Sequence, residues 1–314
     1  MRILIAGTGR LGVAVMTPLL GTHHQIVGVI VNGRGKSRIQ RQTLSLQQKF
    51  LGENLSPLSI AVKTKLPVVW LDNQNDEEIE QIKTLKPDLI ITCGFSLILK
   101  EVVLAIPSMG CINVHSSLLP KHRGASPFAH VIMDGDTESG VTWHVTTPGI
   151  DDGPILAQES FSLHSEETGL SVYMKSCETT RLMAVRALES IEKNGLTGIA
   201  QNEAEATYDP RMTVERARID WSRPADEIER LTRGALAYHH TWFYDKKKKI
   251  HLTKATVVPN ENNVEPGILI DEKPPISIAC GIDALAMVST FYGSNHSTRW
   301  PSMFRQLKRG ERIE

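Results

Sequence analysis

The chain has 314 residues, of which 41% are hydrophobic and 22% charged, and its 35 Lys and Arg residues balance 35 Asp and Glu residues. This length suits about two domains of an ordinary globular protein, and the balanced charge excludes any argument for nucleic-acid binding from net charge alone. Because no stretch reaches the roughly 18 apolar residues of a membrane span and the first residues lack a signal-peptide pattern, we expect a cytoplasmic protein with no membrane partner.

Strand-like and helix-like segments alternate through the first half of the sequence. Short apolar runs predict strands at residues 1–6, 25–31, 66–71, 88–93, 112–115 and 140–147, and amphipathic or charged segments predict helices at 13–20 and 77–84. Because apolar strands alternate with helices, we expect a parallel sheet in an α/β domain.

The second half has a different pattern. A helix is expected over 170–194 and another over 224–236, with a polar, irregular stretch between them at 200–220. Short β segments at 250–255, 267–270, 276–279 and 284–288 are separated by turn-forming Pro, Asn and Gly residues, which indicates a small β-rich domain compatible with a barrel. We therefore predict domains at residues 1–200 and 217–314, joined by a linker at 201–216.

A glycine motif follows the first predicted strand. Gly7-Thr8-Gly9-Arg10-Leu11-Gly12 has the spacing of a dinucleotide-binding turn, and Arg34 stands where a residue could contact the 2′-phosphate of NADP. An NADP-dependent dehydrogenase is therefore one hypothesis. The alternative is that a tight strand-to-helix turn simply favours glycine.

A stronger pattern of polar residues lies downstream. Asn113 and His115 are two residues apart on a predicted strand, so their side chains point to the same side, at the strand end where α/β sheets bind ligands. An amide donor beside an imidazole suits an oxygen that becomes negative, and Asp151 lies in a later Pro-Gly-Ile-Asp-Asp-Gly-Pro loop. A carboxylate near His115 would favour the imidazolium and could relay a proton. The pattern favours acyl transfer without a covalent enzyme intermediate, and the alternative is a structural His-Asp pair.

Three linked motifs in this region resemble the folate-dependent formyltransferase family. They are Asn113-Val114-His115, the loop Ser117-Leu118-Leu119-Pro120-Lys121-His122-Arg123-Gly124, and Asp151-Asp152-Gly153. The resemblance implies that Asn113, His115 and Asp151 are catalytic and that 10-formyltetrahydrofolate is the formyl donor. It also implies an α/β fold with a Rossmann-like, mostly parallel sheet in the N-terminal domain and a smaller, OB-like β-barrel in the C-terminal domain.

The same resemblance implies a set of folate contacts. Gly94-Phe95-Ser96-Leu97-Ile98-Leu99 is similar to the stretch that lines the family's pterin pocket, although Leu97 to Leu99 could instead fill the core. The implied folate-binding residues are Phe95, Leu97, Ile98, Leu99, Ser117, Leu118, Ile150 and Asp152. No metal is expected, because the eleven histidines, including the adjacent His23 and His24, never occur at ligand spacing with Cys or carboxylate partners.

The acceptor amine is less sharply indicated. Residues 217–222 resemble the segment that opens the C-terminal domain of family members acting on methionyl-tRNA or on amino sugars. Basic segments at 34–41, 246–249 and 305–312 could hold initiator tRNA or be solvated surface, whereas residues 40–65 and 234–242 depart from the family pattern. We favour methionyl-tRNA; the alternatives are a nucleotide-linked amino sugar or other small amine, a hydrolase that releases formate, and a folate-binding module without activity.

Overall fold

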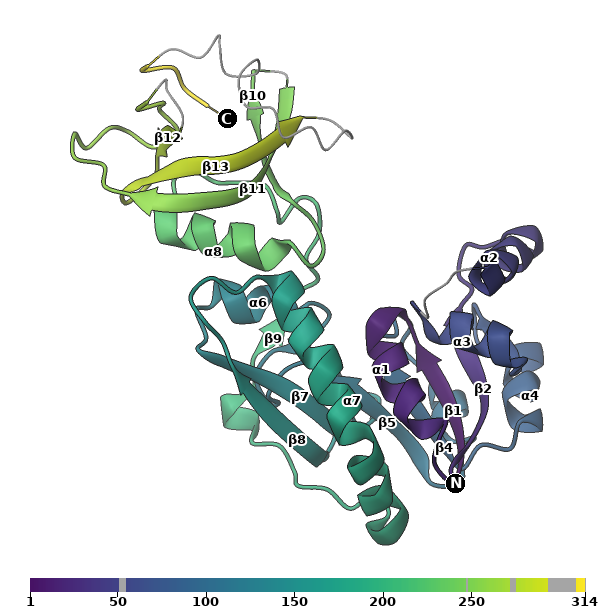
Figure 1. Ribbon diagram of the computed structural model, residues 1–314. Coiled ribbons are helices and arrows are strands. Elements are labelled where there is room, and N and C mark those ends of the chain that lie inside the picture. Colours follow the sequence, from purple (N-terminus) through teal and green to yellow (C-terminus); the bar gives the residue numbers. More distant parts are fainter. Residues whose placement is uncertain (51–54, 247, 272–274, 293–308, 314) are drawn as a thin grey trace. The chain divides into compact units, whose positions relative to one another are not determined.

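The computed structural model describes residues 1–50, 55–246, 248–271, 275–292 and 309–313 (Figure 1). The chain divides into two compact units. The first comprises Met1–Gly124, Ser139–Phe161 and Met174–Tyr208, and the second comprises Ala125–Glu138, Ser162–Tyr173 and Asp209–Glu314. Among the described residues, no helix is both long and apolar enough to cross a membrane.

A seven-stranded sheet forms the centre of the first unit. Its strands are β1 (Arg2–Gly7), β2 (Gln25–Asn32), β3 (Val68–Leu71), β4 (Leu89–Cys93), β5 (Gly110–His115), β7 (Glu138–Val145) and β8 (Ile155–Ser162). They are ordered β3-β2-β1-β4-β5-β7-β8, with β1 to β5 parallel and β7 antiparallel to β5. The strand order reverses between β1 and β4, and ligand sites of open α/β sheets lie at the carboxyl ends of strands beside such a reversal. The prediction of a Rossmann-like, mostly parallel sheet is confirmed.

The helices that accompany this sheet are α1 (Gly9–Leu19), α2 (Arg38–Phe50), α3 (Pro57–Thr64), α4 (Asp76–Thr84), α5 (Glu101–Leu104) and α7 (Gly169–Asn194). The sequence patterns did not predict α2 and α3. The sequence of α2 is almost entirely polar, so hydrophobic periodicity gives little signal there. A signal does exist for α3, because Ser56 caps its N-terminus and Pro57 occupies its first turn.

Packing explains the glycine motif at the turn from β1 into α1. A Cβ at Gly7 would stand 2.6 Å from Cys93 Sγ, and one at Gly12 would stand 2.4 Å from Pro57 Cγ. Gly9 has a φ of 56°, which side-chain-bearing residues rarely adopt. The turn therefore needs glycine for close packing and backbone geometry, without a dinucleotide.

The second unit is built on an antiparallel sheet. Its strands, in the order β10-β11-β13-β12, are β10 (Thr241–Asp245), β11 (Lys248–Val258), β13 (Ala284–Tyr292) and β12 (Ile276–Ala279). Two helices also belong to this unit, α6 (Pro127–Met133) and α8 (Ala225–Ala235). The apolar core includes Trp221 and Phe243, whose rings meet edge to face at 5.3 Å. The predicted small β-rich domain is confirmed, but Gly267 to Ile270 forms isolated bridges instead of a strand.

The polar segment expected as a linker has ordered structure. It contains a short 3-10 helix, η1 (Glu203–Glu205), and the strand β9 (Tyr208–Asp209), which pairs with β6 (Arg123–Gly124). The N–H of Arg123 donates to the carbonyl of Thr207, so this segment lies beside the loop that follows β5.

Candidate active site

Asn113 lies near the carboxyl end of β5 with its side chain held in one orientation. The Thr92 hydroxyl donates to Asn113 Oδ1 at 2.8 Å, which turns the amide nitrogen toward the site. Asn113 Nδ2 lies 3.1 Å from Asp151 Oδ1 and 3.2 Å from His144 Nε2. The residue therefore presents N–H donors toward a carboxylate and an imidazole.

His115 ends the same strand and is almost fully buried. Its Nε2 lies 2.8 Å from the carbonyl oxygen of His122, so this nitrogen carries a proton and donates it. The other ring nitrogen, Nδ1, faces Asp151 Oδ2 at 3.5 Å. This separation is too long for a strong direct hydrogen bond, so the pair interacts mainly through charge.

Asp151 completes the cluster from the loop between β7 and β8. Its Oδ2 accepts the N–H of Gly124 at 2.9 Å, and its backbone has a φ of 50°, in the left-handed region. Burial would raise the pKa of Asp151, but attraction to His115, the contact with His144 and the Gly124 N–H together hold that pKa well below its usual range. The carboxylate is therefore ionised at neutral pH.

His144 is a fourth member that the sequence analysis did not include. This buried histidine on β7 places Nε2 3.4 Å from Asp151 Oδ1, and its Nδ1 lies 2.9 Å from the carbonyl of Val145. Asp151 thus lies against two imidazoles. His144 is the cross-strand partner of Asn113, so it lies beside Asn113 on the same face of the sheet. Had β5 been paired with β7 from the sequence, that register would have predicted His144 as a member of the site.

Gln201 fixes the Asp151 loop from the segment that was expected to be a linker. Its Nε2 donates at 2.8 Å to the carbonyls of both Asp151 and Gly153, and its Oε1 accepts two N–H groups of Arg123 at 2.9 and 3.1 Å. Arg123 is completely buried and also binds Glu203 at 2.7 and 2.9 Å. A hydrogen-bonded chain therefore runs from Glu203 through Arg123 and Gln201 to Asp151.

The two glycines of this loop are closely packed. A Cβ on Gly153 would stand 1.9 Å from the Val145 carbonyl, and one on Gly149 would meet the carboxylate of Asp152. Asp152 accepts a hydrogen bond from Thr147 within the same loop. The Asp152 carboxylate is hydrogen-bonded inside the loop, whereas the Asp151 carboxylate points toward Asn113 and His115.

The implied folate-binding residues occupy several environments. Phe95 and Leu97 are partly buried against the apolar core of the first unit, and Leu99 belongs to that core. Ser117 is buried, and its hydroxyl donates to the Lys121 carbonyl. Ile98 and Ile150 are 80% and 54% exposed, which leaves apolar surface uncovered on the loops after β4 and β7. Leu118 and Asp152 are half-buried. Their role in folate binding stays a prediction.

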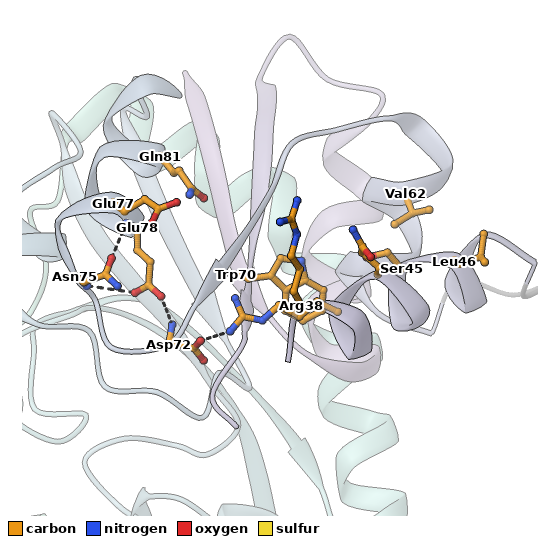
Figure 2. A pocket seen from close by; sticks show the side chains of 12 residues that line it. Arg38, Ser45, Leu46, Val62, Trp70, Asp72, Asn75, Glu77, Glu78 and Gln81 are labelled. Carbon is orange, nitrogen blue, oxygen red and sulfur yellow. Dashed lines mark hydrogen bonds and ion pairs between the residues drawn. The ribbon is translucent and has the colours of Figure 1, made fainter. Parts of the chain in front are cut away.

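A cavity of the first unit lies away from this cluster. Its volume is about 710 Å³, and α2, α3 and the segment from β3 into α4 line it (Figure 2). Arg41 pairs with Asp72 and lies over the Trp70 ring, and Arg38 and Glu77 are among the other polar residues that line the cavity. None of the predicted catalytic or folate-binding residues lines it.

Two of the three basic segments are only partly described, since Lys247 and residues 305–308 lie outside the described residues. Several of the described cations are already paired. Besides Arg41, Lys246 binds Glu311 at 3.0 Å and Arg312 binds Glu265 at 3.0 Å.

The cluster of Asn113, His115 and Asp151 defines the class of protein. An oriented amide donor, a buried imidazole and an ionised carboxylate lie together at the carboxyl end of a central strand, and no activated nucleophile is among them. Such a set can stabilise a developing oxyanion and its proton transfers without a covalent intermediate. These residues therefore have the chemistry expected of an acyl-transfer enzyme.

Comparison with known proteins specifies the class further. The chain belongs to the formyl transferase family, which it matches over residues 1–188, and it matches the C-terminal domain of formyl transferases over residues 211–295. The chain is 34% identical to a methionyl-tRNA formyltransferase of Marinobacter nauticus, over 92% of this chain and 91% of that protein. It is 32% identical to one of Alkaliphilus oremlandii, over 91% and 90%. The predicted enzyme class, a folate-dependent formyltransferase, is confirmed.

Two solved structures with the same fold are sugar N-formyltransferases. The N-formyltransferase of Helicobacter canadensis, solved with folinic acid and dTDP-3-aminofucose, has a TM-score of 0.67 and 20% identity and covers 91% of this chain and 99% of its own. The sugar 3N-formyl transferase WlaRD has a TM-score of 0.65 and 20% identity, covering 91% and 97%. At this identity the likeness concerns the fold.

Proposed function

We propose that the protein transfers the formyl group of 10-formyltetrahydrofolate to the amino group of methionyl-tRNA, with Asn113, His115 and Asp151 as catalytic residues. The observation that carries the proposal is the contact of Asn113 and His115 with an ionised Asp151. Relatives that are 32–34% identical across about nine-tenths of both chains carry the name methionyl-tRNA formyltransferase, which favours this acceptor. Because charged tRNA is the acceptor, we expect the protein to act in the cytoplasm.

The reaction joins the amine nitrogen to the formyl carbon. As that bond forms, the formyl oxygen becomes negative, and Asn113 Nδ2 donates to it after exchanging one of its two present acceptors, Asp151 or His144. His115 Nδ1 is the ring atom on the Asp151 side, and once it carries a proton it can stabilise the same oxygen directly or through a water. The bond from the formyl carbon to N10 of the folate then breaks, N10 receives a proton, and the amine loses one.

The donor would be held by the loops around the cluster. The exposed side chains of Ile98 and Ile150 offer apolar surface to the pterin ring, together with Phe95 and Leu97. The loop that contains Ser117 and Leu118 is held in place by its own hydrogen bonds. No metal takes part in the proposed reaction.

Basic residues after β2 would contact the tRNA. Arg34 and Arg38 are exposed, and neither side chain has a hydrogen bond or ion pair within the described residues, so both guanidinium groups can reach phosphates. Each phosphate contact would make binding weaker as salt rises.

A nucleotide-linked amino sugar is the second candidate acceptor. The observation that favours it is the internal pairing of Arg41, Lys246 and Arg312, which reduces the number of cations available to a long polyanion. A small acceptor needs few phosphate contacts.

The decisive experiment measures tetrahydrofolate release from 10-formyltetrahydrofolate with charged initiator methionyl-tRNA, with dTDP-linked amino sugars, or without an acceptor. We expect release with the tRNA only, and a loss of about 100- to 1000-fold in His115→Ala, as for an oxyanion donor. Tetrahydrofolate release only with a sugar would identify the amino sugar, and not methionyl-tRNA, as the acceptor. Formate release without any acceptor would identify the protein as a hydrolase. A wild-type rate in His115→Ala would refute the catalytic assignment.

A further inference from the structure

Two adjacent histidines meet a distant glutamate at the surface of the first unit. His23 and His24 lie in the connection between α1 and β2, and Glu192 lies near the C-terminal end of α7. His23 Nε2 is 2.8 Å from Glu192 Oε2, and His24 Nδ1 is 3.9 Å from Glu192 Oε1. One nitrogen of each ring and one oxygen of the carboxylate all lie within 4.8 Å of one another.

These separations suit a small metal ion. Zinc binds imidazole nitrogen and carboxylate oxygen at about 2.0–2.1 Å, so two ligand atoms of a tetrahedral site lie about 3.3 Å apart. The separations of 2.8 and 3.9 Å fall on either side of this value. The His24 side chain is fully buried and fixes one ligand, while the His23 side chain is 63% and that of Glu192 39% exposed, so both can rotate slightly toward an ion.

The charge states also suit metal binding. Burial, followed by repulsion from His23, lowers the pKa of His24, so its ring is neutral and offers a lone pair. The hydrogen bond from His23 lowers the pKa of Glu192, which keeps its carboxylate ionised. The N-terminal ammonium group of Met1 lies 3.5 Å from His24 Nδ1 and 3.5 Å from Glu192 Oε1, so it would lose its proton or move aside as an ion binds. Neutral imidazole and ionised carboxylate are the forms that ligate metals, so the proton that His23 Nε2 now donates to Glu192 would leave as the ion binds.

We propose that His23, His24 and Glu192 bind a divalent transition-metal ion of the zinc type, with water in the remaining position. The ion would tie the connection between α1 and β2 to the end of α7, and it would stabilise the first unit. The three ligands are separate from the residues assigned to formyl transfer, so this inference is independent of the proposed function.

The surroundings of His24 set an upper limit on the affinity. Its Nε2 is buried and has no hydrogen-bond partner among the described residues, whereas metal-bound histidines usually donate from the second nitrogen. We therefore expect binding about 10- to 100-fold weaker than at a site with such a partner. Two nitrogen ligands also select against magnesium, which prefers oxygen.

The test is a competition titration of the full-length, tag-free chain with Zn²⁺ and a chromophoric chelator. His23→Ala and Glu192→Gln each remove one ligand, and both residues are exposed enough to be replaced without disturbing the core. The matched controls are His164→Ala and Glu166→Gln, which alter exposed residues of the same types outside the cluster. Wild-type protein and both controls should bind one Zn²⁺, and the two cluster variants should bind more than about tenfold more weakly.

A second measurement follows thermal unfolding of the same proteins. Because a ligand that binds only the folded state stabilises it, Zn²⁺ should raise the unfolding midpoint of the wild type and of Glu166→Gln but not that of His23→Ala, and Mg²⁺ should raise none. Equal zinc affinity in the wild type and in both cluster variants would overturn the proposal, as would absence of zinc binding by the wild type. Formyl transfer in metal-free buffer should be unchanged in His23→Ala, which separates this result from the catalytic assignment.

Discussion

Gln201 offers a direct test of how the active-site loop is positioned, because its side chain contacts the loop and never the reacting atoms. Replacement by Ala removes two hydrogen bonds to the carbonyls of Asp151 and Gly153, both 2.8 Å long, and two more from buried Arg123. Neutral hydrogen bonds contribute about 1 kcal/mol each and those to charged groups about 1.5–3 kcal/mol. The two bonds from Arg123 share one acceptor, Gln201 Oε1, and count as about one charged contact, so together with the two neutral bonds we expect Gln201→Ala to lower the free energy of unfolding by about 3.5–5 kcal/mol.

The effect on catalysis should be separate from the effect on stability. A shift of about 1 Å in a catalytic group can cost on the order of 100-fold in rate, so we expect kcat of Gln201→Ala to fall about 10- to 100-fold. Gln201→Glu keeps the size and the oxygen that faces Arg123, but it turns a carboxylate oxygen toward the two loop carbonyls. It should lose kcat to a similar degree and retain more of the unfolding free energy.

The assay is formyl transfer under saturating substrates, combined with urea unfolding of each variant. Asn202→Ala is the control, because Asn202 caps η1 and does not contact the Asp151 loop. A wild-type kcat in Gln201→Ala, measured at a temperature where the variant is folded, would show that the loop holds Asp151 without Gln201.

Three further predictions concern other groups. Thr92→Val removes the hydroxyl that orients the Asn113 amide, so steady-state kcat should fall, by less than the roughly 100- to 1000-fold loss of an oxyanion donor; an unchanged kcat would mean that Asn113 is oriented without it. The depressed pKa of Asp151 stabilises the fold above the unfolded-state value of about 3.9, and this contribution is lost as pH falls toward the folded pKa. The unfolding free-energy difference between wild type and Asp151→Asn should therefore be constant at neutral pH and shrink in acid; a difference that grows in acid would contradict the assignment. Burial raises the pKa of the thiols of Cys93, Cys111 and Cys280 to about 12, so these thiols should react with a disulfide reagent only after unfolding. Rapid reaction of these thiols in the native protein at neutral pH would be inconsistent with their burial.

Much of the fold could be predicted from the sequence because its signals are local. The run from Leu89 to Cys93 is apolar except for Thr92, as is typical of a central parallel strand, and the residues of β4 are all buried. The two-residue spacing of Asn113 and His115 on a strand likewise places both side chains on one face. Local periodicity was weaker for α2, whose residues are mostly polar, and that helix was not predicted.

The rest of the site depends on contacts between residues far apart in sequence. Gln201 reaches Asp151 across 50 positions, and Glu192 reaches His23 across 169. No spacing rule connects such residues, so the sequence placed Gln201 in a predicted linker and placed Glu192 in no site. His144 is intermediate, since its place beside Asn113 follows once β5 and β7 are paired in register.

The position of Asp151 between two histidines bears on how the proton moves. A general base works best when its pKa lies near the pH of the reaction, and the pKa of Asp151 is held far below that by His115, His144 and the Gly124 N–H, which outweigh its burial. The carboxylate is therefore a poor proton acceptor and a strong source of negative potential. Since the Nε2 proton of His115 is committed to the His122 carbonyl, Nδ1 is the atom left to exchange a proton with the incoming amine or a water. We infer that Asp151 acts by stabilising positive charge on His115 while the proton passes from the amine to the departing folate nitrogen.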